Sequence, residues 1–250
     1  MSEVRGPLEI PRPLMEVWST FDAMPMETLS KPRVMAVGGP RQRSIEELEA
    51  DRRRYGASGN CFDLALWLRH RLREAGLEAD IISDDISSRD AHVAVLSQVA
   101  GQAYLCDLGD MWLRPIAILT TEGYGRRGHF PAAEISLVLE GAKLAVTYHR
   151  PGGKAAHQSY DLRPVRGGEL RDACEQNQGY VAQALVEMRF FDEEAHWEFE
   201  EDHAQWSRWS GLEPELMPLG GWAPLIAKRT GMKRAYVRAC LEAYHRLRGR

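Results

Sequence analysis

Three residues of the chain, Cys61, His92 and Asp107, have the types and the order of a nucleophile, a base and an acid that orients the base. A cysteine thiolate attacks acyl carbons, a histidine holds the thiolate or takes a proton from an attacking amine, and a carboxylate fixes the imidazole. Each of these residue types is commonly structural when it occurs alone. Their order and their settings together indicate chemistry through a thioester of Cys61.

Cys61 opens a predicted helix. The residues before it are charged or helix-breaking, and the helical pattern continues to Ala75, where Gly76 supplies a C-terminal stop. Either Ser58 or Asn60 can cap the helix. Apolar residues recur at spacings of three and four and place the thiol on the inward face. Because unpaired N–H groups and the positive end of the helix dipole meet at a helix start, this position favours a thiolate.

His92 and Asp107 belong to a predicted β-hairpin. Residues 91–99 alternate and are rich in β-branched side chains, and residues 103–108 form a second strand after a turn at Gly101. The separation of His92 and Asp107 is odd, so a loop of two or four residues puts them on one face, either directly opposite or one diagonal step apart. The carboxylate can then orient the imidazole.

Metal binding is the main alternative chemistry for such residues. The chain has no Cys-x-x-Cys or His-x-x-x-His pair, so we expect no metal at Cys61, His92 and Asp107. His196 and His203 stand among carboxylates and form a second possible ligand set. For these two histidines we expect exposed helix positions instead.

Three segments of the chain resemble the arylamine N-acetyltransferases, whose Cys-His-Asp core is shared with transglutaminases and papain-like enzymes. They are similar to the family's Gly-x-Cys-Phe-Glu-x-Asn element, its histidine-containing strand and its Leu-Val-Asp-Val-Gly strand. In this chain they read Gly-Asn-Cys-Phe-Asp-Leu-Ala at 59–65, Ala-His-Val-Ala-Val at 91–95 and Tyr-Leu-Cys-Asp-Leu-Gly at 104–109. A weaker likeness to the family's Pro-Phe-Glu-Asn-Leu element lies at 21–29.

Two segments depart from the family pattern. The family's Arg-Gly-Gly before the cysteine is replaced by Ala57-Ser58-Gly59, so we expect another arginine, Arg53 or Arg54, to neutralise the local acids. The family's Gly-Phe-Gly after the aspartate is replaced by Gly109-Asp110-Met111. The resemblance implies that these three residues, together with Phe62, lie at the substrate site.

The element pattern predicts an α+β fold. Short helices are expected at 14–21 and 44–54, and later helices at 169–186 and 232–248. Between them, a meander of strands is expected at 79–83, 91–99, 103–108, 135–139, 143–149 and 157–162. With the resemblance, this implies a cysteine-proteinase-like helical lobe (1–78) that carries the nucleophile, an antiparallel β-barrel lobe (79–168) that carries His92 and Asp107, and a C-terminal α/β lid region (169–250).

Composition sets outer limits on function. The chain has 250 residues, 44% of them hydrophobic, and a formal charge of −4, which argues against general nucleic-acid binding. Its four cysteines are widely spread and fit no disulfide framework. The N-terminus lacks the apolar core of a signal peptide, and no apolar run suits a membrane span. We therefore expect a cytoplasmic protein without nucleic-acid or membrane partners.

The resemblance implies an N-acyltransferase that works by ping-pong transfer through Cys61 to a small-molecule amine. The expected co-substrate is an acyl-CoA such as acetyl-CoA, or the phosphopantetheine thioester of an acyl carrier protein, with no permanently bound cofactor. Two alternatives stay open. One is an amide synthase, cysteine hydrolase or transglutaminase-like enzyme that acts on a carrier-bound or peptide substrate, and the other is a non-catalytic binding protein.

The last part of the chain carries opposite charges in two segments. The segment 228–250 is basic, which could attract the phosphates of coenzyme A or an acidic carrier protein. The segment 187–202 is acidic and could simply balance it.

Overall fold

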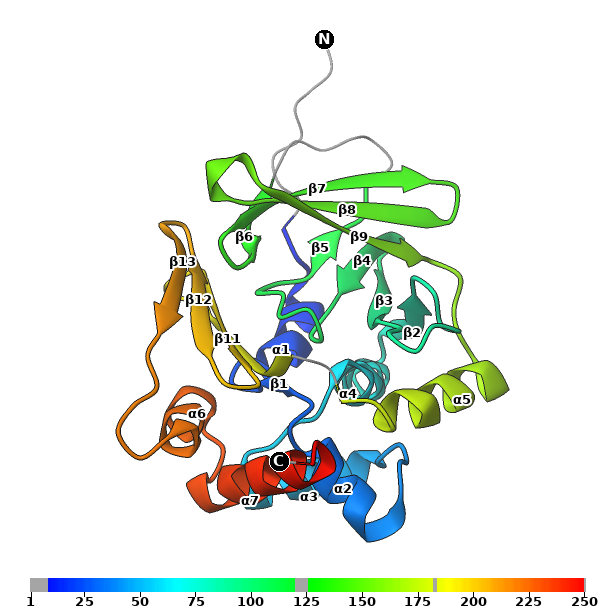
Figure 1. The fold of residues 1–250 in the computed structure, drawn as a ribbon. Coiled ribbons are helices and arrows are strands. Elements are labelled where there is room, and N and C mark those ends of the chain that lie inside the picture. The colour runs from blue at the N-terminus through cyan, green and yellow to red at the C-terminus, as the bar shows by residue number, and fades with distance from the viewer. Residues whose placement is uncertain (1–8, 120–125, 182–183, 250) are drawn as a thin grey trace.

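The structure is a computed structural model that describes residues 9–119, 126–181 and 184–249. These residues form an α+β fold with two antiparallel sheets and helices around and between them (Figure 1). The helices are α1 (Arg12–Ser19), α2 (Lys31–Gly38), α3 (Ile45–Tyr55), α4 (Cys61–Glu74), α5 (Gly167–Gln178), α6 (Trp222–Thr230) and α7 (Arg234–Leu247). The described part of the chain has no helix with the length and apolar character needed to cross a membrane.

The larger sheet has eight strands and is barrel-like. Its order is β5-β4-β3-β2-β9-β8-β7-β6, so neighbours in sequence pair throughout except where β9 joins β2. The strands are β2 (Glu78–Ser83), β3 (Val93–Val99), β4 (Gln102–Cys106), β5 (Ile116–Ala117), β6 (Arg126–Phe130), β7 (Ala133–Glu140), β8 (Lys143–His149) and β9 (Ala155–Asp161). The predicted meander is therefore confirmed, with β5 and β6 as additions that the sequence pattern did not reveal.

The smaller sheet has the order β1-β10-β11-β12-β13. Its edge strand β1 (Met26–Glu27) comes from the N-terminal part of the chain. The others are β10 (Ala184–Phe190), β11 (Ala195–Glu200), β12 (Ala204–Arg208) and β13 (Gly211–Glu215). These strands occupy the segment around Trp197, Trp206 and Trp209. The predicted helix 169–186 is wrong at its end: α5 stops at Gln178, and Ala184 already belongs to β10, where pairing with β1 and β11 overrides the helical pattern.

The prediction of an exposed helix position is wrong for His196. This residue lies on β11 and is 8% exposed, because β11 is covered by side chains on both of its faces. Because many of the residues around His196 in the sequence are charged, the alternation of apolar and polar residues that indicates a strand is not apparent there. His203 follows β11 at the turn to β12, where it is exposed as expected, although not on a helix.

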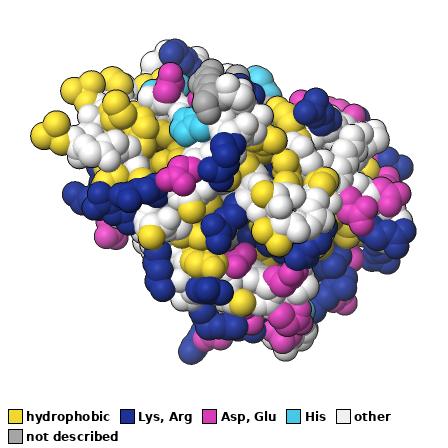
Figure 2. Space-filling model, turned by 60° about the horizontal axis from the view of Figure 1, so that its bottom comes forward, with side chains coloured by type: hydrophobic (Ala, Val, Ile, Leu, Met, Phe, Trp, Pro, Cys, Tyr) yellow, Lys and Arg dark blue, Asp and Glu magenta, His cyan; other side chains and the backbone are white. Residues whose placement is uncertain are grey.

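The helices divide between two hydrophobic cores. α1, α4 and α5 pack with the eight-stranded sheet, and α4 lies directly on β2 and β3. α6 and α7 contribute to a second core with β10, β11 and β12. Figure 2 shows the face formed by the helices at the bottom of Figure 1, where Lys and Arg side chains are interspersed with Asp and Glu. In that region the basic C-terminal segment meets acidic partners, as in the Arg229–Glu215 and Arg248–Glu201 pairs.

Candidate active site

Cys61 is the first residue of α4, as predicted. Asn60 is the cap: its side chain accepts a hydrogen bond from the Asp63 N–H at 3.0 Å, and the Asp63 carboxylate accepts one from the Asn60 N–H at 3.1 Å. This reciprocal capping box fixes the direction of the first helical turn. The Cys61 thiol is half-buried and so remains within reach of a small molecule.

The other three cysteines are buried. Burial raises the pKa of the thiols of Cys174 and Cys240 to about 12, and it raises the pKa of Cys106 further. Since the thiolate is the reactive form of cysteine, these three residues are poor nucleophiles at neutral pH.

The loop that leads into α4 is held by Glu27 of β1. The Glu27 N–H donates to the Gly59 carbonyl at 2.8 Å, and the Gly59 N–H donates to the fully buried Glu27 carboxylate at 3.1 Å. Gly59 has a φ of +93°, and a Cβ there would lie 2.3 Å from an Asp63 oxygen. Only glycine fits this position, two residues before Cys61.

Arg43 neutralises the acids around the helix start. Its guanidinium contacts Asp63 at 2.7 Å and Asp51 at 3.2 Å, and its side chain is only 4% exposed. The expectation that Arg53 or Arg54 would do this is therefore wrong, since Arg53 is 71% exposed and contacts Glu49 on the surface of α3. Arg43 lies in a loop with no motif of its own, so the sequence carried no signal for it.

A buried lysine braces the other side of the same turn. The ammonium group of Lys31 donates to the Asn177 carbonyl, to the Asn177 side chain and to the Tyr180 carbonyl, each at 2.9 Å. The Asn177 side chain in turn accepts from Asn60 at 2.7 Å, which links α5 to the cap of α4. Burial lowers the pKa of Lys31 to about 8, against the opposing influence of Cys61, Asp63 and Glu27.

His92 and Asp107 meet at the end of the β3–β4 hairpin. The turn at Ala100 and Gly101 has positive φ at both residues, and Val99 pairs with Gln102. This register places Asp107 one diagonal step from His92, and the imidazole Nε2 lies 2.6 Å from the Asp107 Oδ2. The structure therefore brings the two predicted residues into direct contact.

Asp107 is fully buried and receives two further hydrogen bonds. The hydroxyl of Tyr160, on β9, donates to the same Oδ2 at 2.6 Å, and the Asp110 N–H donates to Oδ1 at 2.9 Å. Burial and the neighbouring Asp107 carboxylate raise the pKa of Tyr160 well above its usual value, so the hydroxyl keeps its proton. Tyr160 was not predicted as a site residue, because in the sequence it is part of an ordinary predicted strand with no motif around it.

His92 is biased towards its charged form. Burial opposes that charge, but the Asp107 carboxylate and the Cys61 sulfur outweigh burial and raise the pKa of His92 well above 6.5. Because Asp107 occupies Nε2, the imidazole has Nδ1 left for the cysteine. The three predicted residues therefore lie together, with a direct contact between His92 and Asp107 and with Cys61 beside the imidazole.

Gly109 lies against Cys61 and His92, where there is no room for a side chain. A Cβ added there would lie 2.4 Å from the Cys61 Cβ and 3.0 Å from the His92 ring carbon Cε1. The main chain of the β4–β5 loop thus runs close to the side chains of Cys61 and His92, and a larger residue at Gly109 would force them apart.

The two residues after Gly109 are fixed by contacts within the fold, and Asp110, which is half-buried, also lines a cavity. The Asp110 carboxylate accepts from the Tyr148 hydroxyl and from the Trp112 indole, and burial and Asp107 raise its pKa to about 6. Met111 is 1% exposed and has a φ of +56°, a backbone conformation that suits the glycine found there in the family pattern. Phe62 is fully buried in the core. Met111 and Phe62 therefore offer almost no surface to a substrate in this conformation.

No protein-family model matches the chain, and no curated protein matches it in sequence. Solved structures match over nearly the whole chain. The arylamine N-acetyltransferase of Mycobacterium marinum in complex with CoA is 18% identical, with a TM-score of 0.70 and coverage of 91% of this chain and 90% of that chain. The Mycobacterium smegmatis arylamine N-acetyltransferase is 20% identical, with a TM-score of 0.67 and coverage of 96% and 95%.

A third match is more distant. The Bacillus cereus arylamine N-acetyltransferase, described as having a unique Cys-His-Glu catalytic triad, is 13% identical, with a TM-score of 0.65 and coverage of 92% and 94%. Together these likenesses show that the chain has the arylamine N-acetyltransferase fold, which confirms the predicted fold class.

Proposed function

We propose that this protein is an N-acyltransferase in which Cys61 carries the acyl group from a thioester to an amine. The observation that carries the proposal is the contact of His92 with the fully buried Asp107 next to Cys61, the half-buried cysteine at a helix start. This arrangement stands in a fold shared with arylamine N-acetyltransferases.

In the first half-reaction the Cys61 thiolate attacks the thioester carbonyl, and a new carbon–sulfur bond forms. The bond to the donor sulfur breaks, and the leaving thiolate takes the proton of the His92 imidazolium. In the second half-reaction an amine attacks the acyl-enzyme, His92 accepts its proton, and the amide leaves as the Cys61 thiolate is restored. The Cys61 N–H, at the first position of α4, is our candidate for one oxyanion donor.

A coenzyme A thioester is the donor class that the comparisons favour, since the Mycobacterium marinum neighbour was solved in complex with CoA. A second candidate, transfer from a larger or carrier-bound acyl group, is favoured by one observation. Asp110 and Met111 replace an aromatic residue and a glycine of the family pattern next to Gly109. We propose that this change reduces the use of acetyl-CoA.

Intact-mass analysis of the protein after exposure to a panel of acyl thioesters tests this function. The panel holds acetyl-CoA, longer acyl-CoA esters, and the same acyl groups on an acyl carrier protein. We expect one added acyl group on Cys61, none in Cys61→Ala, and transfer to a simple amine. If no donor acylates Cys61, the proposal fails.

Substitutions of the other two residues test the mechanism. We expect His92→Ala and Asp107→Asn each to lower the rate by orders of magnitude while the fold is retained, because the three residues act as one unit. Near-normal turnover in His92→Ala would remove the histidine from the mechanism.

A further inference from the structure

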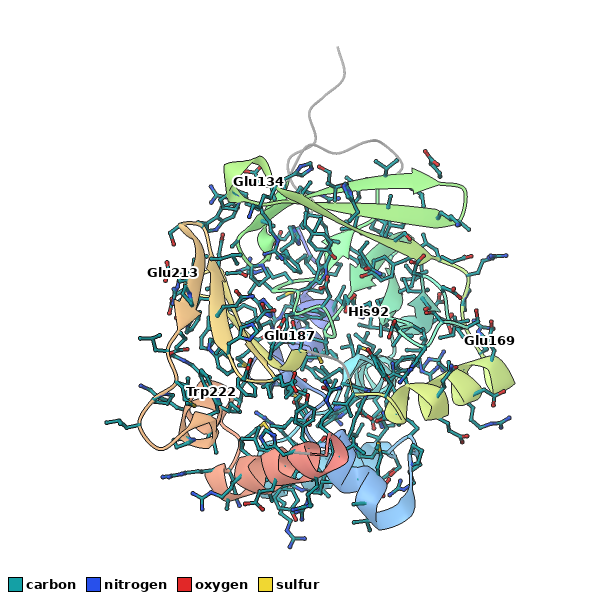
Figure 3. The ribbon with its side chains drawn as sticks, viewed as in Figure 1. His92, Glu134, Glu169, Glu187, Glu213 and Trp222 are labelled. Carbon is teal, nitrogen blue, oxygen red and sulfur yellow. The ribbon has the colours of Figure 1, made fainter. Side chains whose placement is uncertain are left out.

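A second cluster of histidine and carboxylate side chains, outside the candidate active site, lies on the smaller sheet. Glu187 is on β10, and His196 and Glu198 are on β11. One ligand atom from each, a histidine nitrogen or a carboxylate oxygen, can be chosen so that all three lie within 4.8 Å of one another. Figure 3 labels Glu187 in the middle of the molecule, on the sheet formed by β10–β13.

The strand register forces the two glutamates together. Glu187 pairs directly with Glu198 across the antiparallel strands, and His196, two residues before Glu198, presents its side chain on the same face. Like charges directly opposite each other destabilise a sheet. A cation between them would remove this cost.

The histidine is buried and lies against one of the two glutamates. His196 is 8% exposed, and its Nε2 lies 2.9 Å from the Glu187 Oε2. The contact is off the axis of a regular hydrogen bond and is an ion pair when the imidazole carries a proton. A bound metal ion would take the place of that proton between the histidine nitrogen and the glutamate oxygen.

The surroundings provide a cavity and a supporting contact. A cavity of about 420 Å³ is lined by all three residues and also by Asp110, Phe130 and Ser207. The Gln205 side chain donates to the Glu198 carboxylate, as residues that orient metal ligands do. Three cationic side chains also line the cavity, Arg150, Lys154 and Arg208, and Arg208 is paired with Glu193 and Glu213.

From this geometry we propose that Glu187, His196 and Glu198 bind a divalent transition-metal ion, with zinc as the representative ion. One imidazole and two carboxylates are ligands that zinc accepts in proteins, at bonds of about 2.0 to 2.2 Å. The candidate ligand atoms lie within 4.8 Å of one another, so metal binding requires the glutamate side chains to move towards a common centre. Three protein ligands from one sheet leave the remaining positions open to the cavity, where water or a substrate group can bind.

Zinc and cobalt titrations of the chelator-treated protein test the site. We expect one Zn²⁺ per chain by calorimetry, a visible absorption band from bound Co²⁺, and a higher melting temperature with Zn²⁺. His196→Gln and Glu198→Gln should each weaken Zn²⁺ binding by more than about 100-fold. Gln205→Ala should weaken it about 10- to 100-fold, as is usual for a residue that orients a ligand.

Two controls separate this site from other metal-binding groups. His203→Gln removes an exposed histidine near the same strand and should leave Zn²⁺ binding unchanged. Cys61→Ala removes the thiol of the candidate active site and should also leave it unchanged. The proposal is overturned if the wild-type protein binds no stoichiometric metal, if binding survives in a folded His196→Gln protein, or if Cys61→Ala abolishes it. Acylation of Cys61 is measured separately by mass, so either proposal can fail without the other.

Discussion

Gly109 has the most sharply defined role at the scale of single residues, because its main chain contacts both Cys61 and His92. We expect Gly109→Ala to lower the rate of Cys61 acylation by about 100-fold or more, since misplacement of reacting groups by about 1 Å has an effect of this size. Mass spectrometry of the acyl-enzyme over time measures it. Gly38→Ala is the matched control, because a Cβ at Gly38 of α2 meets nothing within 4 Å. Equal rates in the two variants would contradict the contact.

Tyr160 is expected to act through Asp107 as a positioning residue. Loss of a hydrogen bond to a charged group has a typical cost of about 1.5–3 kcal/mol, so Tyr160→Phe should reduce turnover by roughly 10- to 100-fold. Tyr148→Phe is the matched control, since this hydroxyl bonds to Asp110 and not to Asp107. The pH profile of Cys61 alkylation should change in Tyr160→Phe and stay unchanged in Tyr148→Phe. The reverse pattern would show that Asp107 does not depend on Tyr160.

Asp110 should make the stability of the protein depend on pH. Its pKa is about 6 in the folded protein, against 3.8 for the ordinary group. As the pH rises from about 4 to 6, the unfolded chain therefore loses this proton first, and the free energy of unfolding falls. Asp110→Asn has no carboxyl group to titrate, so its free energy of unfolding should not fall in this way. The free energy of unfolding of Asp110→Asn minus that of wild type should therefore increase between about pH 4 and 6, by at most about 3 kcal/mol. Urea denaturation at several pH values measures the difference, and a constant difference would contradict the raised pKa.

At the scale of elements, the start of α4 depends on a buried ion pair. Removal of Arg43 leaves the fully buried Asp63 without its partner, so Arg43→Met should lower the free energy of unfolding by about 3–5 kcal/mol. Arg53→Met removes an arginine of similar size from the surface of α3 and should have an effect near zero. Urea denaturation of both variants measures this. Equal stabilities of Arg43→Met and Arg53→Met would contradict the assignment of Arg43 as the residue that neutralises Asp63.

Sequence analysis predicted those elements that are defined by a local pattern of residues. The Asn60 cap, the apolar spacing of α4, and the alternation of β3 and β4 are local, so the helix start and the hairpin were correctly predicted. Arg43, Lys31 and Tyr160 reach the site from segments far away in the chain. Their roles depend on tertiary contacts, and no local spacing of residues records such contacts.

The smaller sheet shows a second reason why some elements could not be predicted from the sequence. Its strand β1 is two residues long, and β10 pairs with it across a large sequence separation. On β11, His196 and Glu198 line a cavity, so the pattern of buried and exposed positions does not follow polarity. Where polar groups line a cavity, hydrophobic alternation fails as a signal of a strand.

At the scale of the whole molecule, our proposal on the choice of donor rests on two groups of charges, Asp110 and the basic C-terminal segment. Asp110 places an acid beside Gly109, whereas the basic C-terminal segment lies on α6 and α7 and meets acidic partners such as Glu215 and Glu201. The basic charge that could offset Asp110 is therefore partly neutralised where it stands. We expect that acetyl-CoA acylates Cys61 slowly and that larger or carrier-bound thioesters react faster.

The double variant Asp110→Phe with Met111→Gly tests that expectation. Asp110→Phe replaces the carboxylate with an aromatic ring. In Met111→Gly, the glycine adopts without strain the positive φ that Met111 has, although the packing of the buried methionine is lost. We expect a higher rate of Cys61 acylation by acetyl-CoA, measured by intact mass. Met111→Gly alone is the control for lost packing, and it should not raise the rate. If the double variant leaves the acetyl-CoA rate unchanged, or if the wild-type protein is already acetylated rapidly at micromolar acetyl-CoA, then these two residues do not set donor choice.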